Sequence, residues 1–118
     1  EEKKALLKAL EDVQAMIGHM VGVAMASQED PKEIYKVGLN TSRLLMATGD
    51  LIIAWLLLRQ ADIAQNKLAN AGRDTEFYNG KIASAKFFVR SVLPHISIER
   101  AVVESETGEI MNIAEAAF

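Results

Sequence analysis

The sequence has no cysteine among its 118 residues. This absence excludes disulfide frameworks, zinc–thiolate sites and catalytic thiols. A chain without cysteine also fits a reducing compartment, so we expect a cytoplasmic protein. The first conclusion from the composition is therefore that any chemistry or stability must come from other side chains.

The sequence also lacks an excess of basic residues. Its 13 lysines and arginines are outnumbered by 16 aspartates and glutamates, which gives a formal net charge of −3. This balance argues against nucleic-acid binding, which needs a basic stripe or patch. Half of the residues are apolar and a quarter are charged, as is usual in globular proteins.

The length predicts a single domain, residues 1–118, and we find no internal repeat or linker. The chain begins with EEKK, without an initiator methionine, a signal peptide or a transit peptide. This abrupt charged start leads us to expect a fragment of a longer protein.

Motifs for catalysis or metal binding are missing as well. A carboxylate metal site in a helical bundle needs glutamate three residues before histidine, but Met16 precedes His19 and Val92 precedes His95. We find no zinc-protease motif, no Walker loop and no dinucleotide-binding glycine pattern. We therefore expect His19 at the surface and His95 in local structure beside Pro94, and we predict no catalytic, cofactor-binding or metal-binding residue.

What the sequence does contain is a long apolar run, Leu51–Leu58, reading LIIAWLLL. A run without a polar face is predicted to be covered on all sides, with Trp55 as the core anchor. Charged residues lie close before and after it, whereas a transmembrane helix needs about 20 uncharged residues. The run is therefore interpreted as a buried bundle helix and not as a membrane span.

Two carboxylates beside this run, Asp50 and Asp62, are the most interesting charges. If buried, each would need a cationic partner. We interpret them as members of structural ion pairs in preference to catalytic groups. The candidate partners are Arg43, Arg59 and Lys67.

Apolar residues spaced three and four apart predict an all-α fold: an up-down bundle of three long helices and a short C-terminal helix. The expected helices are Glu2 to about Ser27, Pro31–Asn70, Glu76–Glu104 and Ile110–Ala117. In the first helix the inner stripe is predicted to be Leu6, Leu10, Val13, Ile17, Met20 and Ala24, with Asp12 among the solvated residues.

The second helix is predicted to lie at the centre of the bundle because it is apolar on two sides. Its inner stripe is expected at Ile34, Val37, Thr41, Leu44, Thr48, Leu51, Trp55 and Leu58, and its second side at Leu45, Ile52, Leu56 and Ile63. Asp30 and Pro31 predict its start and Gly72 its end. Gly38 and Gly49 are possible bend points. Pro94 predicts a kink or break in the third helix, since proline removes a backbone hydrogen bond.

Three segments carry a family resemblance. The string GDLIIAWLLLRQADIA, from Gly49 to Ala64, resembles the extra C-terminal domain of a branch of the acyl-CoA dehydrogenases. FYNGKIASAKFFVRSVLP, from Phe77 to Pro94, is similar to the next block of that domain, and EIMNIAEAAF to its ending. These segments occur in the right order and spacing, and only the first helix matches by pattern alone.

The resemblance implies a parent flavoprotein of fatty acid metabolism that oxidises an acyl-CoA thioester to the 2,3-enoyl-CoA. In that family a glutamate removes the α proton and FAD accepts the β hydride. No residue of this chain matches the catalytic base or an FAD contact. The resemblance therefore implies a non-catalytic structural domain, with FAD only in the parent enzyme, that packs on the catalytic domains or a neighbouring subunit of a homo-oligomer.

Two other hypotheses stay open. The chain is a stand-alone helical protein-interaction module if no enzyme sequence precedes it. It is a small-molecule binder only if a cavity opens between helices beside Trp55, and we expect no binding of FAD or an acyl-CoA to the isolated chain.

Overall fold

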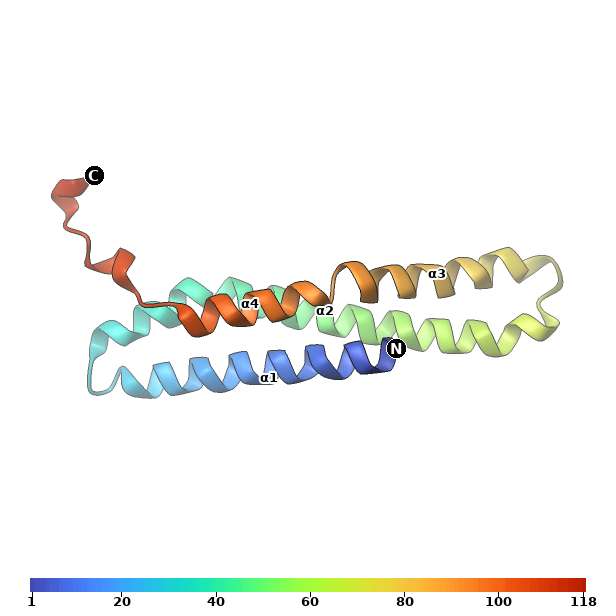
Figure 1. Ribbon diagram of the computed structural model, residues 1–118, viewed down its shortest axis with the longest axis horizontal. Helices are drawn as coiled ribbons and strands as arrows, with labels where there is room; N and C mark the ends of the chain where they lie inside the picture. Colours follow the sequence, from blue (N-terminus) through green and yellow to red (C-terminus); the bar gives the residue numbers. More distant parts are fainter.

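The computed structural model describes residues 1–118 and contains helices and no strands, which confirms the all-α prediction (Figure 1). The molecule is long and thin, with extents of 67 × 29 × 17 Å. Its α-helices are α1 (Glu2–Ala26), α2 (Ile34–Lys67), α3 (Thr75–Ser91) and α4 (Pro94–Ser105). Helix α3 packs mainly on α2, and α4 packs mainly on α1, so that α2 is the helix the others are arranged along (Figure 1).

Helix α2 is continuous over 34 residues, a length of about 51 Å at 1.5 Å per residue. Neither glycine considered as a bend point interrupts it. The predicted range is longer because short 3₁₀ turns, Pro31–Glu33 and Leu68–Asn70, extend both ends. The predicted start and end signals are confirmed. At the start, the backbone N–H of Lys32 donates to Asp30 Oδ1 at 3.1 Å, and after the end Gly72 has a positive φ of 53°.

Pro94 divides the third predicted helix in two, as its missing N–H requires. Helix α3 ends at Ser91, and Pro94 occupies the first position of α4. The break lets α4 leave the path of α3 and pack against α1.

The predicted C-terminal helix, Ile110–Ala117, does not form. Two 3₁₀ turns, Glu109–Asn112 and Glu115–Ala117, take its place in an arm that projects from the bundle (Figure 1). The residues expected to dock, Ile110, Met111, Ile113 and Ala114, are all exposed. The physical reason is that helices this short are marginal unless a neighbour covers their apolar side, and the arm has none.

The core is built around small side chains on α2. Asn40, Ala47 and Ala54 recur every seven residues and are buried. Small residues in this row let α1 on one side and α3 with α4 on the other approach α2 closely. The large side chains that are fully buried come from α1, α3, α4 and the α3–α4 break: Val13, Met16, Val89, Leu93, Ile96 and Val103. Leu44, Leu51 and Leu58 of α2 are partly buried and pack against them.

The predicted inner stripe of α2 is correct in part: Leu44, Leu51 and Leu58 pack against the core, whereas Thr41, Thr48 and Trp55 directly follow the buried row. Trp55 is 48% exposed and is not the core anchor. Within Leu51–Leu58 only Ala54 is buried, so the prediction that this run is covered on all sides was wrong for this chain. The reason is geometric: α1 lies along one flank of α2 and α3 with α4 along the other, and the side of α2 opposite to Ala54 is left open.

By length and composition alone, α2 with its flanking turns, Pro31–Asn70, is also apolar enough to cross a membrane. Its most apolar 18-residue window has a mean hydropathy of 1.4, and 11% of that window is buried. A single helix of this kind is weak evidence for a span. The absence of a span therefore stays a prediction, based on the charges beside Leu51–Leu58.

The row of small residues on α2 leads to a first prediction. Ala54→Leu should lower the free energy of unfolding by about 1–3 kcal/mol, because the larger side chain pushes the packed helices apart. Ala83→Leu, on the exposed side of α3, is the matched control and should change stability little. Urea denaturation followed by circular dichroism measures both, and equal effects of the two substitutions would contradict the close packing.

Candidate interaction surface

One carboxylate is buried in the interface between α1 and α4. Asp12 is 1% exposed and accepts hydrogen bonds from the Lys8 ammonium and the Ser97 hydroxyl. Arg100 Nη1 donates to Asp12 Oδ1 at 3.0 Å, and Arg100 Nε donates to Glu104 at 2.8 Å. The prediction that Asp12 faces solvent was wrong because α4 packs over that side of α1.

Burial disfavours the charged form of Asp12, but the hydrogen bonds from Lys8, Ser97 and Arg100 outweigh this effect and lower the pKa of its carboxyl group. The carboxylate is thus ionised and fully engaged at neutral pH. Its chemistry is that of a structural link between two helices, and its hydrogen bonds all come from groups of its own chain.

The carboxylates singled out in the sequence behave differently. Asp50 is partly exposed and Asp62 is exposed, so neither needs a protein partner. Arg43 pairs with Glu99 at 2.7 Å. The guanidinium of Arg59 lies 5.1 Å from the ring centroid of Trp55. The predicted ion pairs, of Asp50 and Asp62 with Arg43, Arg59 or Lys67, are absent.

A polar groove of about 400 Å³ lies between α2 and α4. His95 lines it together with Asp50, Arg43 and Glu99, so the structure brings three charged side chains near one histidine. The Arg43–Glu99 pair occupies two of these groups, and no three ligand-type side chains come together as a metal site would require. His19, on α1, is partly exposed and lines none of the grooves described here.

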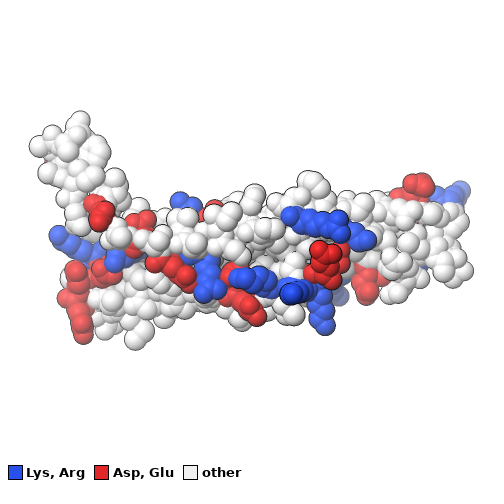
Figure 2. Space-filling model, viewed as in Figure 1, with Lys and Arg blue, Asp and Glu red and all other residues white.

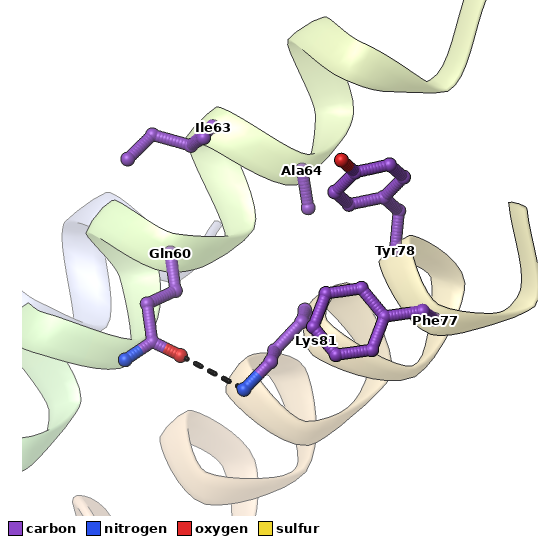
Figure 3. A pocket seen from close by; sticks show the side chains of 6 residues that line it. All are labelled: Gln60, Ile63, Ala64, Phe77, Tyr78 and Lys81. Carbon is purple, nitrogen blue, oxygen red and sulfur yellow. Dashed lines mark hydrogen bonds between the residues drawn. The ribbon is translucent and has the colours of Figure 1, made fainter. Parts of the chain in front are cut away.

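A second hollow, of about 320 Å³, lies where α3 begins to run along α2 (Figure 3). Lys81 spans its mouth: its Nζ donates to Gln60 Oε1 at 3.4 Å and lies 5.4 Å from the ring centroid of Phe77. The Phe77 and Tyr78 rings meet edge to face at 5.5 Å. Ile63 and Ala64 complete the lining, and the only charge present is that of Lys81.

A third groove, of about 240 Å³, opens between α1 and α2 beside Trp55. The small-molecule hypothesis required a cavity at this place, and sequence reasoning did not find this groove. Every residue of its lining is apolar: Leu6, Leu7, Leu10, Leu51, Ile52 and Trp55.

The main feature of the surface is its apolar character. Twenty-two large apolar residues are exposed, whereas only eleven apolar residues are buried. On the face drawn in Figure 2, charged side chains gather along the bundle, and the end of the arm presents mainly uncharged residues. The side of α2 turned away from the other helices contributes five residues, which we call the outer stripe: Ile34, Leu45, Ile52, Leu56 and Ile63, each 44–70% exposed.

Contiguous exposed apolar surface is typical of a site that binds a partner. Comparison with known proteins agrees with this: residues 1–114 match the family described as acetyl-CoA dehydrogenase C-terminal like. The chain belongs to this family. The match confirms the resemblance found in the three sequence segments and extends it over α1.

The relatives are acyl-CoA dehydrogenases. A broad-specificity linear acyl-CoA dehydrogenase, FadE5, of Mycobacterium tuberculosis is 46% identical over 99% of this chain and 20% of its own length. A butyryl-CoA dehydrogenase of Syntrophomonas wolfei is 38% identical over 70% of the chain and 14% of its own length. A 3-methylmercaptopropionyl-CoA dehydrogenase of Ruegeria pomeroyi is 34% identical over 80% of the chain and 15% of its own length. The chain therefore spans a fifth or less of each of these relatives.

The buried aspartate leads to a second prediction. Asp12→Asn should destabilise the chain by about 1–3 kcal/mol at pH 7, because the amide makes weaker hydrogen bonds than the carboxylate. In addition, the NH2 group of the amide is a donor and cannot accept a hydrogen bond from the donors that surround Asp12. The exposed neighbour offers the matched control: Glu11→Gln should have little effect. Urea denaturation of both variants measures the difference.

Comparison of Asp12→Asn with the unchanged chain also tests the pH dependence of stability. Because the pKa of Asp12 is lowered by folding, its stabilising contribution is fully present above the unfolded pKa and is lost as pH falls below about 4 towards the folded value. The stability difference between the unchanged chain and Asp12→Asn should therefore shrink as pH falls from 5 to 3. A difference that stays constant over this range would show that Asp12 is not the group concerned.

Proposed function

We propose that this chain is the C-terminal, non-catalytic domain of an FAD-dependent acyl-CoA dehydrogenase, and that its function is to join the catalytic domains or a neighbouring subunit through apolar surface. The parent enzyme would oxidise an acyl-CoA to the 2,3-enoyl-CoA in fatty acid metabolism, in the cytoplasm and as a homo-oligomer. The supporting observation is the match to relatives named as acyl-CoA dehydrogenases over only a fifth or less of their length.

The side chains of this domain support assembly in preference to catalysis. The one buried carboxylate, Asp12, is held by three donors and cannot serve as a free base. In contrast, the excess of exposed apolar residues gives the domain a large surface to bury in a complex.

Two grooves of this chain offer little to FAD. The groove beside Trp55 has an entirely apolar lining and offers no hydrogen-bond donor to a pyrophosphate. The hollow at Lys81 offers one cation, which already contacts Gln60 and Phe77. We therefore assign FAD to the part of the parent enzyme outside these residues, and no catalytic step is placed on this domain.

A third prediction follows. The isolated chain should neither bind FAD nor reduce an electron-accepting dye with butyryl-CoA, whereas a polypeptide extended upstream to the length of the relatives should do both. Trp55, the only tryptophan, reports binding to the isolated chain through its fluorescence. Saturable quenching by FAD or butyryl-CoA would instead support the small-molecule hypothesis.

The reading frame upstream of Glu1 separates the proposal from the stand-alone module. Acyl-CoA dehydrogenase sequence before Glu1 supports the proposal, and a start codon just upstream contradicts it. If the longer polypeptide exists, a version without residues 1–118 should keep the residues for flavin chemistry but aggregate, because it exposes the surface that this domain covers.

A further inference from the structure

The outer stripe of α2 is the longest apolar surface that the chain itself leaves open. At about 100° per residue, Leu45 and Ile63 lie about 180° from the buried Ala54. The stripe extends over 30 positions, from Ile34 to Ile63, which is about 44 Å of helix. With the smaller and polar residues that lie between its five apolar members, its positions are Ile34, Gly38, Thr41, Leu45, Gly49, Ile52, Leu56, Arg59 and Ile63.

Only one of these positions, Arg59, is charged, and its guanidinium lies over the Trp55 ring instead of extending from the stripe. The hydroxyl groups of Thr41, on the stripe, and of Thr48, beside it, are satisfied within α2. Thr41 Oγ1 donates to the carbonyl of Val37, and Thr48 Oγ1 to that of Leu44, both at 2.8 Å. Burying the stripe would therefore leave neither of these two threonine hydroxyls unpaired.

We propose that the outer stripe binds the outer stripe of a second copy of this chain, with the two α2 helices antiparallel and a two-fold axis between Thr48 and Gly49. This inference deepens the proposed assembly role, on which it rests, by naming the same domain of a neighbouring subunit as the partner. A two-fold contact requires a surface that is complementary to itself, so that residue i meets j and j meets i.

The residue identities meet this requirement. Positions equally far from the axis face each other in such a pair, so Leu45 meets Ile52 of the partner subunit, and Ile34 meets the partner's Ile63. Thr41 meets the partner's Leu56, which places a small side chain against a large one. Arg59 meets the partner's Gly38, so the one cation of the stripe faces neither its own copy nor another charge.

Glycines support a close approach at the axis. An added Cβ at Gly49 or Gly38 would meet no atom of the chain within 4 Å, so the fold itself does not require glycine at either place. Glycine weakens a helix interior, and here it leaves room for the backbone of another helix. Gly49 lies next to the proposed axis, where the two helices would be closest.

The surface is also wide enough. Leu7 and Leu10 of α1 line one groove with Ile52, so the flank of α1 continues the stripe sideways. The face is about 44 Å long, and where α1 lies alongside α2 it is two helices wide, at about 10 Å per helix. Its area is therefore on the order of 800 Å², the area per partner of a typical stable interface.

The test uses the 118-residue chain in sedimentation equilibrium. The unchanged chain should be a dimer. Leu45→Glu and Ile52→Lys should each give monomers, because a charge then meets an apolar side chain in both halves of the contact. When the two variants are mixed, the dimer should return. The carboxylate introduced in one copy then meets the ammonium introduced in the other, while Leu45 and Ile52 still meet in the second half.

Phe87→Glu is the control, since Phe87 is 68% exposed on α3 and lies off the stripe. It should leave the dimer intact, and circular dichroism should show all variants helical. A monomeric unchanged chain, a dimer that survives Leu45→Glu, or a mixture that stays monomeric would each overturn the proposal. Sedimentation with phosphatidylcholine vesicles in place of dimerisation would assign the stripe to a lipid surface and also overturn it.

These outcomes are distinct from failure of the assembly role. If the chain is monomeric but binds the separately expressed catalytic part, the two-fold contact is wrong and the proposed function stands. If it forms the predicted dimer but no enzyme sequence precedes it, the contact stands and the proposed function is wrong.

Discussion

The structure depends on one constraint: α2 is apolar around most of its circumference, but its own chain covers only one side. The covered side has small residues, Asn40, Ala47 and Ala54, which let the other helices come close. The open side has the large ones of the outer stripe. Helices in a soluble single-domain protein show the opposite arrangement, with large apolar residues inside. The domain is therefore organised around a helix whose larger apolar surface faces outward.

The position of α4 depends on two features that act together. Pro94 breaks the third helix, which frees α4 from the line of α3. Asp12 then gives α4 a fixed place on α1 through Ser97 and Arg100. A buried carboxylate with several donors is specific in geometry, because sliding α4 by one turn would remove both hydrogen bonds that α4 gives it and leave only Lys8 of α1. The Pro94 break allows α4 to change direction, and the hydrogen bonds of Asp12 then fix its position on α1.

The sequence was sufficient to predict the helices, and the reasons are local. Asp30 acts through its side-chain cap on Lys32, and Pro31, Gly72 and Pro94 act through their backbone, so the ends and the break follow from the residue types. The buried row of α2 was missed, although Leu44, Leu51 and Leu58 were correctly placed against the core. Where apolar residues surround a helix, the spacing does not say which side faces the chain's own core, and the large Trp55 was chosen over the small Ala54.

Asp12 was missed for a related reason. Charge alone assigned it to the solvent, although it stands between the core residues Ala9, Val13 and Met16, and this setting was the available signal. Its partners Ser97 and Arg100 are more than 80 residues away and come near only after the Pro94 break. The C-terminal arm was also misjudged, since its apolar residues predicted docking but could not indicate that no partner surface exists within the chain.

The unequal division of apolar residues has a consequence for stability. Burial of apolar surface is the main favourable term in folding, and this chain leaves more of its large apolar side chains outside than inside. A partner that binds only the folded form adds to stability by mass action. Burial of the open side of α2 in a partner would therefore add to the stability of the folded domain. A partner that recognises α2 thus stabilises the same helix along which α1, α3 and α4 pack.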